Sequence, residues 1–133
     1  MIHFAMRSLL VRSIFLFVSA GLLFSCRGEE TANQIHGQWQ AFAAEEEGRA
    51  LQVRLEEIRF EFDEKGDYRF FSTLNHREAG QYELQNGLLY TLDTLHQGAP
   101  TKRVKITRLE ADTLVLSMQE EGKERVLSLQ RTQ

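Results

Sequence analysis

Apolar and polar residues alternate with a period of two along most of the chain, the spacing typical of β-strands that bury one face. The clearest run is residues 58–62, in which Ile58, Phe60 and Phe62 alternate with two charged residues. Similar short runs recur to the end of the chain. Together they predict an apolar, inward face made of Trp39, Ile58, Phe60, Phe62, Tyr68, Phe70, Tyr82, Leu84, Tyr90, Leu92, Val104, Ile106, Leu114, Leu116 and Met118.

Short polar segments, most of them with a glycine, separate these runs. They are residues 63–67, 85–87, 96–100, 110–112 and 120–122. Asn86-Gly87 favours a tight hairpin because both residues tolerate a positive φ. Connections this short make neighbouring strands antiparallel.

With a strand in 35–43 and another within 51–62, the pattern predicts about eight strands in up-and-down order. A meander of that size with one apolar face has exposed edges unless it closes on itself. The predicted fold class is therefore all-β, a small antiparallel up-and-down barrel. Residues 43–55, which include Glu45-Glu46-Glu47, fit the pattern least. They predict either a short helix or a long first loop across the mouth of the barrel.

The first part of the chain has the layout of a secretory signal. Arg7 and Arg12 precede an apolar run at 14–24, which is followed by Ser25 and Cys26. The run is about 11 residues long, whereas a membrane-spanning helix needs roughly 20, and a longer segment would bury Arg12 in the bilayer. This argues for cleavage rather than for an uncleaved anchor.

A cysteine placed directly after a small residue resembles the lipobox of bacterial lipoproteins. The resemblance implies that Cys26 is diacylated on sulfur, that the chain is cut before it, and that its amine is then acylated. Two or more acyl chains hold a protein stably on a membrane. The predicted organisation is a signal peptide at 1–25, the acylated cysteine and a flexible tether at 26–34, and one barrel domain at 35–133.

The tether also bears on the location. Glu29-Glu30 resembles the export signal that directs lipoproteins of Bacteroidetes to the outer face of the outer membrane, and an ordinary solvated linker is the alternative. Arg27 stands where retention at the inner membrane of enterobacteria requires Asp. We therefore expect the bacterial outer membrane, on either its periplasmic or its cell-surface face.

Composition excludes some functions. The formal net charge is −3, and the mature chain keeps all the acidic residues, which argues against nucleic acid as a partner because phosphate binding needs a concentrated basic face. Cys26 is the only cysteine, so no intramolecular disulfide can form. Stability then depends on packing.

Gly37-Gln38-Trp39 resembles the Gly-x-Trp opening of lipocalins and of the lipocalin-like lipoproteins of Bacteroidetes. The segments 60–68, 80–84 and 109–116 resemble later elements of that group, in the same order. The resemblance covers nearly all of the mature chain. It implies that a late arginine, Arg131, packs over Trp39 and closes the base of the barrel. The chain is shorter than true lipocalins and lacks their cysteine pair, which argues against a deep ligand cup.

An eight-stranded barrel is just wide enough either to be filled by side chains or to hold one small ligand. The large inward candidates favour filling. The functional alternative is that aromatic residues toward one end line a shallow apolar cavity, with tyrosine hydroxyls as the polar contacts. These candidates are Tyr68, Phe70, Tyr82 and Tyr90.

Other candidate sites are weaker. His36, His76 and His96 lack the short spacing of zinc ligands and are interpreted as surface or turn residues. No nucleophile-elbow sequence is present, and no cofactor is expected. In residues 102–108, Arg103 and Lys105 are predicted to face solvent. The sequence thus predicts a non-enzymatic outer-membrane lipoprotein that binds a small hydrophobic ligand. The alternative is a filled barrel serving as a module of an envelope complex or as a hydrolase inhibitor.

Overall fold

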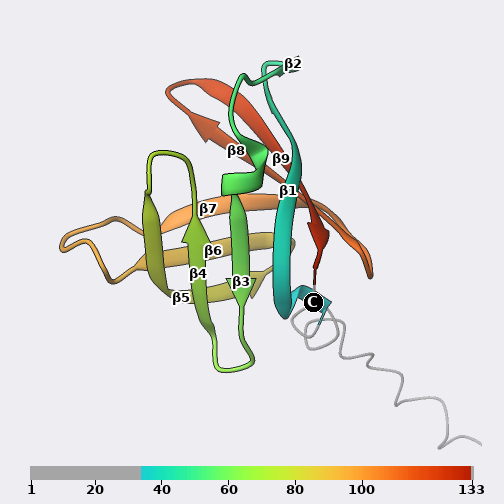
Figure 1. Ribbon diagram of the computed structural model, residues 1–133. Helices are drawn as coiled ribbons and strands as arrows, with labels where there is room; N and C mark the ends of the chain where they lie inside the picture. Colours follow the sequence, from blue (N-terminus) through green and yellow to red (C-terminus); the bar gives the residue numbers. More distant parts are fainter. Residues whose placement is uncertain (1–33, 133) are drawn as a thin grey trace, which may run out of the picture.

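The computed structural model describes residues 34–132 and consists of one antiparallel sheet (Figure 1). Alternating strands and tight turns follow the order expected from the period-two pattern. The elements are β1 (Gly37–Glu46), β2 (Arg49–Ala50), a 3-10 helix η1 (Leu55–Glu57), β3 (Arg59–Phe62), β4 (Asp67–Phe71), β5 (Arg77–Gln85), β6 (Leu88–Asp93), β7 (Lys102–Leu109), β8 (Thr113–Glu120) and β9 (Lys123–Arg131).

The sheet closes on itself. β1 pairs with β3 on one side and with β9 on the other, from Trp39 opposite Arg131 to Glu46 opposite Arg125. Figure 1 shows β1 lying beside β9 although they are the first and the last strand along the chain. The result is the predicted closed barrel of eight antiparallel strands, with β2 as a short extension paired to the end of β1. Closure satisfies the backbone groups that the first and last strands would otherwise expose.

Neither predicted alternative describes residues 43–50, which form the end of β1, a tight turn and β2, because pairing with β9 extends β1 through Glu46. β1 continues to Glu46, and a tight turn with positive φ at Glu47 and Gly48 leads into β2. A loop at 51–54 and the three-residue helix η1 then lead to β3. Figure 1 places β2 and η1 at the end of the barrel opposite the C-terminus. Among residues 34–132, no helix is long and apolar enough to cross a bilayer.

The core lies inside the barrel and follows the predicted alternation on most strands. Burying a large apolar side chain contributes about 1.5–3 kcal/mol, so this face supplies much of the stability. Nine of the predicted inward residues are buried: Trp39, Ile58, Phe60, Phe62, Tyr68, Tyr82, Val104, Leu114 and Leu116.

The predicted inward face of β6 was wrong, because the side chains that face inward are shifted by one residue. Leu89, Thr91 and Asp93 face the interior, whereas Leu92 is 38% exposed. The two-residue turn after β5 sets this register, because it pairs Leu84 with Leu89 and Tyr82 with Thr91. Directly opposed residues of an antiparallel pair lie on the same face of the sheet, so a shift of one residue exchanges the two faces. Tyr90 therefore lies on the outer face.

Candidate ligand-binding pocket

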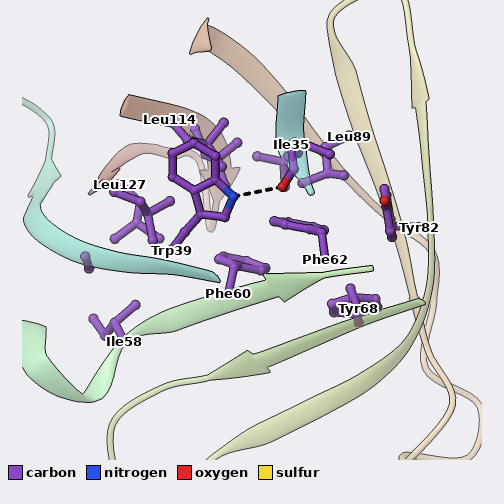
Figure 2. Packing of buried hydrophobic residues seen from close by; sticks show 14 of the residues in the cluster. Ile35, Trp39, Ile58, Phe60, Phe62, Tyr68, Tyr82, Leu89, Leu114 and Leu127 are labelled. Carbon is purple, nitrogen blue, oxygen red and sulfur yellow. Dashed lines mark hydrogen bonds between the residues drawn. The ribbon is translucent and has the colours of Figure 1, made fainter. Parts of the chain in front are cut away.

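One end of the barrel is filled by side chains, and we call it the closed end (Ile35, Trp39 and Arg131). Ile35 and Trp39 are fully buried, and the indole Nε1 donates a hydrogen bond of 2.8 Å to the Ile35 carbonyl oxygen. Figure 2 shows this bond, with Leu114 and Leu127 packed beside the indole. The segment just before β1 thus acts as a plug.

Arg131 covers the outside of this plug. Its guanidinium carbon lies 4.3 Å from the centroid of the Trp39 ring, so the contact implied by the family resemblance is present. Such a cation–π contact is worth roughly 0.5–2 kcal/mol. The same guanidinium donates hydrogen bonds to the carbonyl oxygens of Gln34, His36 and Ala111. It therefore joins the start of the barrel to the β7–β8 turn.

Tyr82 belongs to the closed half of the interior. Its ring meets the Phe62 ring edge-on, with centroids 5.0 Å apart, and its hydroxyl donates a 2.7 Å hydrogen bond to the Asp63 carbonyl oxygen. Burial, followed by the negative charges of Asp63 and Asp67, raises the pKa of Tyr82 to about 12. The hydroxyl is thus a fixed, neutral donor committed to the β3–β4 turn.

The opposite end, the open end, holds a pocket of about 350 Å³. Most of its wall is apolar. Small side chains, among them Ala44, Ser72 and Thr91, leave the space that large residues occupy at the closed end. Leu51 and Val53, from the loop before η1, form part of the rim. The rest of the wall includes Ile58, Phe60, Tyr68, Phe70, His76, Glu78, Leu89, Lys102, Val104, Met118, Glu120 and Arg125.

A buried carboxylate lies in this wall. Glu78 is only 4% exposed and accepts hydrogen bonds from the Tyr68 hydroxyl at 3.2 Å and the Lys102 Nζ at 2.8 Å. The Nε2 of His76 lies 3.0 Å from the Glu78 Oε2. Burial is the largest single influence on this carboxyl and by itself raises its pKa. The hydrogen bonds from these three partners and the charge of Lys102 outweigh burial, so the net effect lowers the pKa of Glu78.

Tyr68 keeps its proton beside this carboxylate. The side chain is 2% exposed, and burial, then the charge of Glu78, raise the pKa of its hydroxyl. A neutral hydroxyl can go on donating to Glu78 across the whole physiological range. The polar patch of the pocket, defined as Tyr68, His76, Glu78 and Lys102, is therefore built around one negative charge.

A second acid–histidine pair ties the loops at the open end together. Asp93, also buried, accepts a hydrogen bond from the Leu95 backbone N–H at 2.9 Å and contacts the Nδ1 of His96. The rings of His76 and His96 stack with centroids 5.8 Å apart. The stack links the β4–β5 turn to the β6–β7 loop. Within the described residues, no group of three or more His, Cys, Asp or Glu side chains is placed to hold a metal ion.

The four aromatic residues predicted from the sequence do not come together. Tyr68 and Phe70 line the pocket. Tyr82 lies at the closed end, and Tyr90, on the outer face, pairs with Glu83 and Arg103 of the neighbouring strands. Tyr82 and Tyr90 therefore lie outside this pocket, and a contact of either tyrosine with a ligand stays a prediction.

The polar patch was missed, although the sequence contains a signal for it. Glu78 lies four and six residues before Tyr82 and Leu84, which are predicted to face inward, so it falls on the same face of the strand. Lys102 lies two and four residues before Val104 and Ile106, so it shares their predicted face of the strand. Extending each alternation backward along the chain places both charged residues inside. His76 and His96 do lie in loops, as predicted, but each contacts a buried carboxylate.

No family model and no curated protein matches the chain. Among solved structures, it is similar to a lipocalin-like protein from Bacteroides uniformis, with a TM-score of 0.53 and 17% sequence identity. The similarity covers 71% of this chain and 96% of that protein. The fold is a lipocalin-like barrel. The predicted signal peptide, Cys26 and the predicted tether up to residue 33 lie outside the described residues, and cleavage and acylation at Cys26 stay predictions.

Proposed function

We propose that this protein is a lipid-anchored binding protein that carries one small, largely apolar molecule in the pocket at the open end. The observation that carries the proposal is the pocket itself, about 350 Å³ inside a closed barrel. Ligand sites typically measure about 300–1,000 Å³ and combine apolar walls with a few polar groups. This pocket has that composition and lies near the lower limit of size.

The division between the two ends supports the same proposal. The closed end is plugged by Ile35 and Trp39, so a ligand would enter at the open end, where Leu51 and Val53 line the pocket. A module that acts only through its outer surface gains nothing from an unfilled interior, and a void lowers stability because the side chains around it have fewer packing partners. The alternative of an interaction module or hydrolase inhibitor assumed a filled barrel, so the pocket weighs against it.

The anchor is the second half of the proposal and rests on the sequence. Cys26, acylated, would hold the barrel to the outer membrane, on either face. The tether at 26–34 spans at most about 30 Å when fully extended, which keeps the barrel close to the membrane surface. Mass spectrometry of the protein from its native membrane tests this half: an unmodified Cys26 would refute it.

Calorimetric titration with 4-phenylbutan-1-ol, a neutral molecule small enough for the pocket, tests the binding half. The purified protein is placed in nanodiscs of neutral lipid, and empty nanodiscs correct for partition into the lipid. We expect one saturable site that Met118→Trp removes, because the larger ring fills the pocket that Met118 lines. Tyr90→Trp adds bulk on the outer face of the barrel and serves as the matched control. Absence of saturable binding, or equal loss in both variants, would count against the pocket as the site.

A further inference from the structure

Glu78 is a costly residue for a barrel interior. A carboxylate taken out of water is tolerated only when opposite charge and hydrogen bonds compensate it, and an apolar residue in the same place often gives an equally stable protein. The position faces the pocket and is nearly inaccessible to solvent. Packing alone therefore does not call for a negative charge here, and recognition of a ligand gives it a role.

The partners of Glu78 differ in how firmly they are held. Tyr68 is buried and fixed, so its hydroxyl stays on the carboxylate. The Lys102 side chain is 54% exposed and reaches Glu78 from the edge of the pocket. Lysine has a flexible four-carbon stem and a strongly hydrated ammonium. Lys102 can thus leave the carboxylate and regain water at small cost, and Glu78 then needs another cation.

The charges around the pocket disfavour an anionic ligand. Among the described residues that line it, Lys102, Arg125 and His76 are the side chains that can be positive, and each contacts a carboxylate. Arg125 bonds Glu46 at 2.7 Å and Glu120 at 2.6 Å. A carboxylate ligand would have to compete with these acids for every cation. A positively charged ligand needs only to displace Lys102.

We propose that the ligand is a small amine with one apolar group, whose ammonium takes the place of Lys102 on Glu78. The apolar group would lie against Phe60, Phe70 and Val104, which line the same pocket. The inference rests on the proposed function and deepens it, since it names the class of molecule bound at that site. No covalent step is involved, and Lys102 acts as the resident counter-ion of the empty pocket.

Three ligands with the same phenylbutyl skeleton test the proposal on the wild-type protein: 4-phenylbutylamine, 4-phenylbutan-1-ol and 4-phenylbutanoate. A hydrogen bond to a charged group is worth about 1.5–3 kcal/mol, so we expect the amine to bind at least about tenfold more tightly than the alcohol. The carboxylate should bind most weakly. Calorimetry at pH 7 on the protein in neutral nanodiscs gives the dissociation constants of the three ligands, after the heat measured with empty nanodiscs is subtracted.

Two variants connect the preference to Glu78. Lys102→Ala removes the competing ammonium and should tighten amine binding several-fold, while a merely structural role of Lys102 would weaken all three ligands. Lys105→Ala, on the outward face of the same strand, is the matched control and should change nothing. Glu78→Gln should reduce the amine to the affinity of the alcohol.

The outcomes separate the two proposals. If the alcohol binds and the amine binds no better, or if Lys102→Ala weakens the amine, the amine inference is wrong and the pocket function stands. If none of the three ligands saturates, the pocket function itself fails. Should Glu78→Gln not fold, the wild-type series and Lys102→Ala decide the question.

Discussion

The two ends of this barrel are built on the same strands, yet one is a packed core and the other holds a pocket. At the closed end the indole of Trp39 fills the interior and its one polar atom bonds the Ile35 carbonyl oxygen. At the open end, Ala44 and Thr91 leave space, and a buried carboxylate replaces apolar contacts. The difference teaches that the packed core and the pocket proposed for recognition are separated along the barrel axis. A substitution should therefore affect mainly one or the other.

The largest expected loss of stability follows from a substitution at the closed end. Trp39→Ala removes the largest fully buried side chain, its hydrogen bond and its contact with Arg131, and should cost about 3–5 kcal/mol of unfolding free energy or more. Urea denaturation followed by circular dichroism measures it. Phe70→Ala, in the wall of the pocket, is the counterpart and should cost less. An equal loss in both variants would contradict the division between the ends.

Gly80→Ala comes next. A Cβ at this position would lie 1.9 Å from the Leu92 carbonyl oxygen, which belongs to the backbone of the neighbouring strand. Strands β5 and β6 must move apart to admit it, so we expect a loss of about 3 kcal/mol. Thermal unfolding tests the prediction against Gly48→Ala, where the new Cβ meets no atom within 4 Å and only the positive φ makes the change unfavourable. A smaller loss at Gly80 than at Gly48 would mean that the close approach is not a constraint.

The third prediction concerns pH. The folded pKa of Glu78 is lowered, so its charge stabilises the fold above the ordinary value of 4.5, and this contribution is lost as pH falls through the folded pKa. Glu78→Gln should cost about 1.5–3 kcal/mol at neutral pH, because hydrogen bonds to a charged group are lost. Its stability should also decline less steeply below pH 4.5 than that of the wild type. Urea denaturation at several pH values gives the free energy of unfolding of both proteins. If the two free energies fall in parallel below pH 4.5, the Glu78 charge does not stabilise the fold.

The smallest effect should follow from Tyr82→Phe. The change removes the hydrogen bond to the Asp63 carbonyl oxygen and leaves the ring in place, at a cost of about 1 kcal/mol. Affinity for 4-phenylbutan-1-ol should stay within about twofold of the wild type, since Tyr82 does not line the pocket. Tyr68→Phe, which removes a hydroxyl that does lie in the polar patch, is the paired measurement. A larger binding defect in Tyr82→Phe than in Tyr68→Phe would reverse our assignment of the two tyrosines.

Much of the fold was predictable from the sequence for a local reason. Side chains of a strand alternate between faces, so runs such as 58–62 report both the strand and its buried side. The Asn86-Gly87 turn is equally local, because it depends on which residues tolerate a positive φ. Both predictions needed no knowledge of distant parts of the chain, and both are confirmed.

The face of β6 shows where this reasoning stops. Leu88, Tyr90 and Leu92 are together more apolar than Leu89, Thr91 and Asp93, yet the second set faces inward. Pairing across the hairpin decides the face, and it can override the apolar content of the strand itself.

By itself, the alternation in the sequence determined most strands, their turns and the barrel class, and the resemblance to lipocalins implied the contact of Trp39 with Arg131. Only the tertiary structure decided which end of the barrel is empty and that Glu78 and Lys102, 24 residues apart, meet in its wall. The physical reason is that alternation is a property of neighbouring residues. A cavity and an ion pair instead depend on which side chains of separate strands share one volume.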